Sequence, residues 1–422
     1  MFEAREVQTA EGDRMRRTAV GALTAATAAL ALSAAPGASG IALPIHAWNI
    51  QPVITSLDEP RGLSFDAHSD LYVAEAGHAR TGAAGVTSSG AISKYRWAGG
   101  DLEPAWSTAF TSIFTPSAGG GTQVLGPAAV SASSGACPTR AHLPSPGSAH
   151  DQRGCVVQAV LSGSRRGVRA DFGLDAPQIG HLFDLSAATG AARSRSDVGD
   201  RDYAWTAAHA SLFPDDFPDA NPYAVLTVGR PRHAHRDADD RPAVRTFVAD
   251  AASNTVSEVL RGGRSRVISY IPNEAAGAER DATPTCIAEG PDGDLYVGAL
   301  DLLSNLAVGG GQSNVWRVDP NSKNWKHNAT LWASGFTTIN GCTFDSSGHF
   351  WASELFYPNA SGPPGDVAYA SVTSPDAITH VVGNSDIALP GGIVEGPDKA
   401  MYVSTGAADT APGSGAVLRV SH

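Results

Sequence analysis

The sequence has few charged residues, and it lacks Cys-x-x-Cys pairs and the common catalytic signature motifs. Only 17% of its 422 residues are charged, and none of its four cysteines belongs to a Cys-x-x-Cys pair. A zinc site built from these cysteines is therefore not expected. The sequence also lacks a Gly-x-Ser-x-Gly elbow, a Walker loop and a Rossmann fingerprint, so hydrolysis at a nucleophile elbow and nucleotide chemistry have no support.

Basic residues are in deficit as well. The 30 Lys and Arg residues are outnumbered by 42 Asp and Glu residues, which leaves a formal net charge of −12. A chain with this charge repels nucleic acid and anionic membrane surfaces, so we expect neither as a partner. A neutral or cationic partner is easier to accommodate.

Long apolar segments are missing except near the N-terminus. There, Arg16 and Arg17 precede an Ala-rich run from Val20 to Leu32, which small residues follow. This pattern predicts a signal peptide over residues 15–40, because the run is too short to cross about 30 Å of hydrocarbon. We interpret residues 1–14 as an extension upstream of the true start. We expect the mature protein to be secreted and extracellular, without a membrane span.

Glycine and proline, in contrast, are abundant. The chain has 46 Gly and 27 Pro, and 42% of its residues are hydrophobic. This composition is typical of many short strands joined by turns rather than of long amphipathic helices. Because folds built from repeats run longer than ordinary domains, we treat residues 48–422 as a single domain.

One strand, turn and strand pattern recurs along the chain. A first apolar segment is followed by a turn rich in Pro, Asp and Gly and by a second segment of the Leu-Tyr-Val type, so each copy is predicted to be a β-hairpin. A third alternating strand follows each clear copy. The clear copies occupy residues 61–75, 285–297, 340–352 and 391–403, and two weaker copies lie at 155–185 and 223–260.

The six repeats predict an all-β fold, a six-bladed β-propeller with four-stranded blades. The last three copies begin at residues 285, 340 and 391, so 55 and 51 residues separate them. Such blades expose apolar faces, and the ring must therefore close. We predict that Gln51 to Leu57 supplies the outer strand of the blade that ends with Ala416 to Val420.

Two insertions interrupt the second and third repeats. Pro138 to Arg153 is predicted to be a surface loop, and Asp200 to Leu212 a single short helix, because aromatic residues are spaced along it and a Pro- and Asp-rich segment ends it.

Several motifs follow one another in a fixed order along the chain. They are Glu59-Pro-Arg-Gly-Leu63, Leu71 to Gly77, Ala220 to Tyr223, Thr246 to Asp250 with Asn254, Asp294 to Gly298, Val315 to Val318, Gly335 to Ile339 and Gly415 to Val420. Their order resembles the ScyD/ScyE family of exported bacterial NHL-like proteins. The resemblance covers nearly the whole mature chain and implies a propeller fold, but it implies little about chemistry. The segment Pro138 to Arg153 departs from the family pattern.

Three acids end the second strands of their repeats, namely Glu75, Asp250 and Glu354. If equivalent ends of the blades converge at one mouth of the channel, these carboxylates are candidate ligands for Ca²⁺, with Asn254 and Asp301 completing the site. The alternative is structural, because Asp and Glu in such positions commonly accept backbone N–H bonds from a neighbouring turn.

Glu289 and Glu395 form a second candidate pair. Each stands in a Glu-Gly-Pro sequence after a first strand, where other repeats carry Phe65 and Phe344. This arrangement resembles metal-dependent lactonases of the gluconolactonase type, which would imply a divalent ion that polarises a carbonyl and activates water. The alternative is a chance match beside a Gly-Pro-Asp turn.

His233 and His235, with nearby acids, could ligate a transition metal, although alternating charges in a polar stretch are typical of a solvated loop.

The four cysteines could form two disulfide bonds, and the sequence does not decide whether either bond is present. Cys137 and Cys155 could join one loop-rich stretch, and Cys286 and Cys342 lie on neighbouring repeats, where a bond needs Cα atoms within about 7 Å.

Two functions from different classes remain on these grounds. The first is a binding or scaffold protein that recognises a small molecule, a glycan or a protein at one mouth of the ring. The second is a metal-dependent hydrolase or lyase that uses channel carboxylates. We prefer the first, and only the second requires the acidic residues to meet at one ion.

Overall fold

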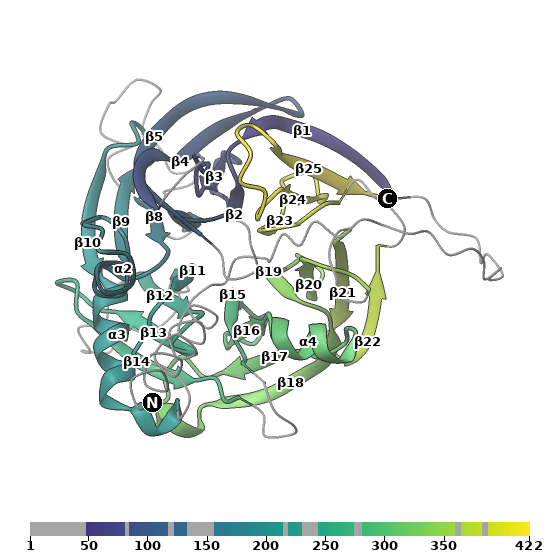
Figure 1. Ribbon diagram of the computed structural model, residues 1–422. Helices are drawn as coiled ribbons and strands as arrows, with labels where there is room; N and C mark the ends of the chain where they lie inside the picture. Colours follow the sequence, from purple (N-terminus) through teal and green to yellow (C-terminus); the bar gives the residue numbers. More distant parts are fainter. Residues whose placement is uncertain are drawn as a thin grey trace, which may run out of the picture.

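A computed structural model describes residues 48–80, 84–116, 122–132, 156–213, 218–229, 244–273, 281–358, 364–381 and 387–422. These residues form six antiparallel sheets arranged as a ring, as Figure 1 shows. The predicted six-bladed β-propeller is therefore confirmed. Each sheet is one blade, and the blades follow one another in chain order around the ring.

The first three blades contain thirteen of the strands. Blade 1 contains β2 (Pro60–Phe65), β3 (Leu71–Glu75), β4 (Gly85–Ala98), β5 (Asp101–Pro116) and β6 (Thr122–Leu125). Blade 2 contains β7 (Pro127–Ala132), β8 (Val156–Leu161), β9 (His181–Ser186) and β10 (Ala192–Asp197). Blade 3 contains β11 (Pro222–Gly229), β12 (Val244–Asp250), β13 (Thr255–Val259) and β14 (Ser265–Tyr270).

The other three blades have four strands each. Blade 4 contains β15 (Pro284–Glu289), β16 (Leu295–Ala299), β17 (Ser313–Val318) and β18 (Ala329–Phe336). Blade 5 contains β19 (Ile339–Phe344), β20 (His349–Glu354), β21 (Asp366–Ser371) and β22 (Ser374–His380). Blade 6 contains β23 (Ile393–Glu395), β24 (Met401–Thr405), β25 (Gly415–Ser421) and β1 (Asn49–Leu57).

The turns between first and second strands repeat one hydrogen bond in four blades. An Asp in the turn accepts a hydrogen bond from an aromatic residue of the second strand, which fixes where the hairpin reverses. The pairs are Asp66 with Tyr72 (2.9 Å), Asp292 with Tyr296 (3.0 Å), Asp345 with Trp351 (2.9 Å) and Asp398 with Tyr402 (3.4 Å). The predicted hairpins at these positions are present.

Hydrophobic side chains are buried in clusters between neighbouring blades. Between blades 1 and 2, for example, the rings of Phe110 and Phe183 lie 5.0 Å apart, and between blades 6 and 1 those of Tyr402 and Phe65 lie 5.1 Å apart. Fully burying one such side chain contributes about 1.5–3 kcal/mol. A single blade cannot bury both of its faces, so the blades stabilise one another.

A disulfide joins two adjacent blades near the axis of the ring. Cys286 of β15 and Cys342 of β19 are bonded, with their Cα atoms 5.5 Å apart. This settles one of the two cysteine pairings left open by the sequence. Cys137 and Cys155 lie outside the described residues.

The ring closes through the N-terminal strand. β1 pairs antiparallel with β25 from Asn49↔Ser421 to Leu57↔Gly415, which confirms the closure predicted from the sequence. Trp48, just before β1, packs against His422 with ring centroids 3.5 Å apart and the ring planes tilted by 37°. In blade 6, β1 is therefore the outermost strand and β23 is the innermost strand, beside the axis of the ring.

The predicted inserted helix is present as α3 (Val198–Ala208), with a 3₁₀ turn η3 (Ala210–Leu212) after it. The expectation of one helix was wrong, because the described residues also contain α2 (Arg165–Phe172) and α4 (Leu302–Val308). α2 has only eight residues, of which two are buried, so it presents too few apolar positions to indicate a helix from the sequence. Ser164 nonetheless caps it by accepting a hydrogen bond from the Gly167 N–H.

Several expectations fall on residues that the structure does not describe. These are the signal peptide at 15–40, the extension at 1–14, the loop Pro138 to Arg153 and the pair His233 and His235. Within the described ranges, no helix is long and apolar enough to span a membrane.

Candidate functional site

A cavity of about 270 Å³ lies on the axis of the ring. The first strands of the six blades, β2, β7, β11, β15, β19 and β23, supply its walls. The cavity is slightly smaller than the ~300–1,000 Å³ of a typical drug-sized ligand site. Most of its lining is backbone and small apolar side chains, so the few polar side chains in it determine what it can hold.

Arg61 is the charged side chain that β2 turns into this cavity. Its Nη2 donates to Oε1 of Glu59 at 2.5 Å and to the carbonyl oxygen of Val124 at 2.8 Å. Its Cζ lies 5.5 Å from the ring centroid of Tyr223, in a cation–π contact. Nε is buried and has no hydrogen-bond partner among the described residues. A guanidinium with an unused donor beside a cavity is suited to an oxygen-bearing ligand.

Glu59, immediately before β2, is completely buried. Its Oε2 has no hydrogen-bond partner in the described part of the chain. Burial raises the pKa of this carboxyl to about 7, although the charge and hydrogen bond of Arg61 act in the opposite direction. Nearby Asp409 raises it further. Near neutral pH both the neutral and the ionised form of this carboxyl are therefore populated.

The backbone at Glu59 has a purely structural explanation. Its φ of 50° recurs at the matching residue of three other blades, Thr283 (48°), Thr338 (49°) and Leu389 (49°). In all four blades the carbonyl of this residue accepts a hydrogen bond from a backbone N–H one or two positions after the end of the second strand. The conformation thus belongs to the repeat, and what distinguishes blade 1 is the buried carboxyl that Glu59 places there.

Two further blades add polar groups to the cavity. The Tyr223 hydroxyl of β11 donates to Oδ1 of Asn340 at 3.1 Å, and Nδ2 of Asn340 donates to the carbonyl of Pro390 at 2.9 Å. Burial raises the pKa of Tyr223, so this phenol remains a neutral donor. Arg61, Tyr223 and Asn340 therefore present polar atoms from blades 1, 3 and 5.

The three acids predicted at the strand ends accept backbone hydrogen bonds from their own blades or from the segments that lead into them. Oε2 of Glu75 accepts the Asp58 N–H at 3.1 Å, and Oε1 of Glu354 accepts the Thr337 N–H at 2.6 Å. Oδ1 of Asp250 accepts three backbone N–H groups, those of Asn221, Ala252 and Ser253. This is the structural role considered as the alternative in the sequence.

The expected meeting of these acids at one ion is not found. Among the described residues, the one group of at least three potential metal ligands within 4.8 Å contains Glu354 but neither Glu75 nor Asp250. The reason is their position, because these acids end second strands, one strand away from the channel wall, and they bond back to the segment before the first strand.

The residues expected to complete that site hold loops instead. Oδ1 of Asn254 accepts the Thr283 N–H at 3.0 Å, while its Nδ2 donates to Asn273 and to Asp281, each at 2.9 Å. Asp301 accepts a short hydrogen bond from the Ser304 hydroxyl at the start of α4.

The second pair of acids has divergent surroundings. Glu395 accepts hydrogen bonds from the N–H (3.0 Å) and hydroxyl (2.8 Å) of Ser346 and lies 3.7 Å from Nζ of Lys399. Glu289 is exposed and lines the cavity. The contacts of Glu395 therefore explain it without an ion.

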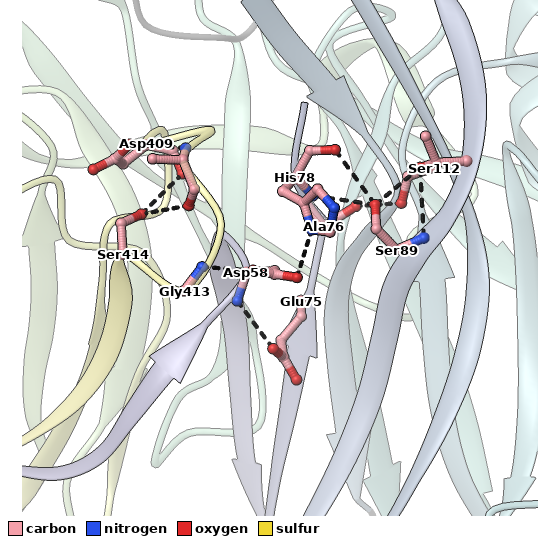
Figure 2. Close-up of polar contacts among 11 residues, drawn as sticks. Asp58, Glu75, Ala76, His78, Ser89, Ser112, Asp409, Gly413 and Ser414 are labelled. Carbon is pink, nitrogen blue, oxygen red and sulfur yellow. Dashed lines mark hydrogen bonds and ion pairs between the residues drawn. The ribbon is translucent and has the colours of Figure 1, made fainter. Parts of the chain in front are cut away.

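A His and Asp pair, not predicted from the sequence, lies beside Glu75. Figure 2 shows Nδ1 of His78 facing Oδ2 of Asp58, at 2.7 Å. Oδ1 of Asp58 accepts the N–H of Gly413 at 2.7 Å, which ties blade 1 to the loop before β25. The backbone N–H of His78 in turn donates to Oγ of Ser89 at 3.1 Å. Hydrogen bonds thus hold Asp58, His78, Ser89 and Gly413 in place.

Asp250 also has a partner that the sequence did not indicate. Asp202 of α3 is buried beside it and accepts a hydrogen bond from the hydroxyl of Ser257 at 3.1 Å. Burial and the neighbouring charge of Asp250 raise the pKa of Asp202 well above its usual range. Oδ2 of Asp202 and Oδ2 of Asp250 have no hydrogen-bond partner among the described residues, so a proton held between the two carboxyls would satisfy both and link α3 to blade 3.

The sequence matches no family model and no curated protein. Solved structures with a similar fold include a streptogramin B lyase (12% identity, TM-score 0.42, covering 89% of this chain and 97% of that one). A luciferin-regenerating enzyme is similar (11% identity, TM-score 0.45, 89% and 96%). So is the PQQ domain of a pyranose dehydrogenase from Coprinopsis cinerea (11% identity, TM-score 0.46, 89% and 96%). These likenesses concern the fold alone, and the ScyD/ScyE family stays a prediction.

Proposed function

We propose that this protein is a secreted binding propeller whose central cavity holds a small molecule with a carboxylate or carbonyl oxygen. The observation that carries the proposal is the placement of Arg61, which is buried, lines the cavity and has an unpartnered Nε. A buried donor without a partner costs about 1–3 kcal/mol, and an oxygen of a bound ligand would remove that cost.

The charge state of Glu59 also favours binding of a ligand that carries an oxygen. While ionised, it balances the positive charge of Arg61 through the 2.5 Å contact. When it takes up a proton, the guanidinium charge becomes available to an anion entering the cavity. The neighbouring Tyr223 of blade 3 and Asn340 of blade 5 then supply further polar groups, which would orient the ligand.

The cavity volume limits the size of the ligand. A space of about 270 Å³ suits a small metabolite rather than an entire polymer. A glycan or a protein would have to bind at a mouth of the ring. The metal-dependent hydrolase or lyase depended on a meeting at one ion of Glu75, Asp250 and Glu354, or of Glu289 and Glu395. Among the described residues, the one group of three potential metal ligands contains only Glu354 of these five acids, which favours the binding proposal.

The test is calorimetry with small carboxylates and their neutral counterparts, for example benzoate with benzamide and glucuronate with glucose. We expect at least one carboxylate to bind the wild type and its counterpart to bind at least tenfold more weakly. The double variant Glu59→Gln with Arg61→Gln removes both charges of the buried pair together, which is less disruptive than removing one. It is expected to lose this binding.

Arg317→Gln is the matched control, because Arg317 is exposed and pairs with Asp292 and Asp294 away from the cavity. It should bind like the wild type. Binding that survives in the double variant, or a panel in which no oxygen ligand binds, would overturn the proposal.

A further inference from the structure

The geometry points to a binding site for one divalent transition-metal ion in blade 5, formed by Glu354, Asp366 and His380. The site is separate from the central cavity, and it does not depend on the proposed function. Nothing in the sequence brought these three residues together, because 12 and 14 positions separate them, and only Glu354 was a candidate.

Three consecutive strands bring the residues to one edge of the blade. Glu354 ends β20 and lies opposite Asp366, the first residue of β21. His380 ends β22 and lies opposite Ala368 of β21. Side chains at matching ends of adjacent strands are within reach of one another. The ladder of the blade, rather than a mobile loop, therefore sets the geometry.

The distances fit ligands of a single ion. Nδ1 of His380 lies 3.0 Å from Oδ2 of Asp366 and 3.4 Å from Oε2 of Glu354. All three ligand atoms lie within 4.8 Å of one another. Metal bonds of about 2.0–2.2 Å at angles between roughly 90° and 109° place ligand atoms about 2.8–3.6 Å apart. Both measured separations from the imidazole fall in this range.

An independent observation is the buried oxygen of Glu354. This residue has no exposed surface, and the Thr337 N–H holds its Oε1. Its Oε2 points at His380 and has no hydrogen-bond partner among the described residues. Among the described residues this oxygen has the 3.4 Å ion-pair contact with His380 but no hydrogen bond, so its burial is incompletely compensated, and a cation bound between the two groups would satisfy it.

The ligand types select the class of ion. One imidazole nitrogen and two carboxylate oxygens suit Zn²⁺, Mn²⁺ or Fe²⁺, whereas Ca²⁺ takes about 6–8 oxygen ligands. The side chain of His380 is 20% exposed, which leaves a route for the ion. Tyr357 stacks on the imidazole at a centroid distance of 4.3 Å and holds the ring in place.

The competing occupant of the same space is a proton on Nδ1, which would make an ion triad without metal. Calorimetric titration of EDTA-stripped protein with Zn²⁺, Mn²⁺ and Ca²⁺ distinguishes the two. We expect one Zn²⁺ or Mn²⁺ per chain, with Ca²⁺ bound at least tenfold more weakly. The titration is done in a His233→Asn, His235→Asn background, so that those residues contribute nothing.

Two single variants test the ligands. His380→Asn and Glu354→Gln should each weaken Zn²⁺ binding at least tenfold. His349→Asn is the matched control, because Nδ1 of His349 lies 3.0 Å from Oδ2 of Asp345 at the other end of β20, in a pair with one acid. It should leave the affinity unchanged.

A spectroscopic measurement keeps the test decisive if a variant fails to fold. X-ray absorption at the zinc edge of the loaded protein should show one imidazole and otherwise oxygen ligands. Two or more imidazoles or a sulfur ligand would overturn the proposal, as would absence of Zn²⁺ and Mn²⁺ binding or unchanged binding in folded His380→Asn.

Discussion

At Glu59, a carboxyl group occupies a position that Thr283, Thr338 and Leu389 occupy in other blades. The backbone is the same at all four residues, with φ between 48° and 50°. The side chain of Glu59 alone among them is acidic, and it contacts Arg61 of the cavity. The backbone position is thus the same in four blades, and the acidic side chain of Glu59 makes it respond to pH in blade 1.

Glu59→Gln should change how stability depends on pH. The pKa of Glu59 is raised from 4.5 to about 7 by burial, so the folded protein holds a proton that the unfolded chain has released. The resulting stabilisation is fully present below about pH 4.5 and is lost as the pH rises to about 7, by at most roughly 3 kcal/mol. Urea unfolding between pH 4.5 and 8 should show a flatter profile for the variant.

Glu103→Gln, which changes an exposed glutamate of β5, is the control and should keep the wild-type profile. Identical profiles for Glu59→Gln and the wild type would contradict the assigned role of burial.

The roles of single residues were only partly predictable. The sequence located Glu75, Asp250 and Glu354 at the ends of their strands, as observed. It could not show that one oxygen of each acid accepts backbone N–H groups, which in the case of Asp250 lie as far as 29 positions away. The cavity role of Arg61 was missed, since a Pro-Arg-Gly motif does not reveal which way its side chain points.

At the scale of elements, α3 depends on a pair of buried acids. Burial and the charge of Asp250 raise the pKa of Asp202. The folded state therefore retains a proton that the unfolded state loses, and its stabilisation decreases as the pH rises above about 3.8. Asp202→Asn supplies a permanent donor, so the variant should lose less stability than the wild type toward alkaline pH.

Urea unfolding at several pH values, followed by near-ultraviolet circular dichroism, measures this effect. Asp101→Asn, at the exposed start of β5, is the control. If Asp202→Asn unfolds with the same pH dependence as the wild type, the shared proton is not what holds the helix.

The disulfide between β15 and β19 should contribute substantially to stability. Its cysteines are 56 positions apart, and closing such a loop in the unfolded chain is worth roughly 2–4 kcal/mol. We expect Cys286→Ala with Cys342→Ala to lower the free energy of unfolding by this amount. Equilibrium urea unfolding measures it, and thiol counting by mass spectrometry verifies the bond in the wild type. Equal stability of the two proteins would contradict the expectation.

The helices show where prediction of elements ends. α3 was predicted because aromatic residues are spaced along it, whereas α2 is basic and largely exposed, and α4 has exposed Leu303, Leu306 and Val308. β6 was also missed, because four residues carry too little periodicity to be recognised.

At the scale of the whole molecule, the architecture was predictable because each repeat is a unit that cannot bury its faces alone. Six such units with matching hairpins leave few arrangements other than a closed ring. The contents of the ring were not predictable, because the cavity combines side chains from blades that are far apart in sequence, such as Arg61 and Asn340.

Removal of β1 should destabilise the entire ring. Ile54 and Leu57 of this strand are buried between blades 6 and 1, so a chain starting at Asp58 would expose that interface and the edge of β25. We expect a clear fall in melting temperature and binding of a hydrophobic dye. A chain starting at Trp48 is the control, and equal melting temperatures would show that β1 is dispensable.

The pairing of β1 with β25 also links the ring to the order of synthesis. The strand made earliest among those described must wait for the strand made last before blade 6 can form. Until then, a growing chain keeps an unpaired strand at each end of the arc of blades. Incomplete chains are therefore the species most exposed to edge-to-edge aggregation, and a chaperone that covers strand edges would protect them at that stage.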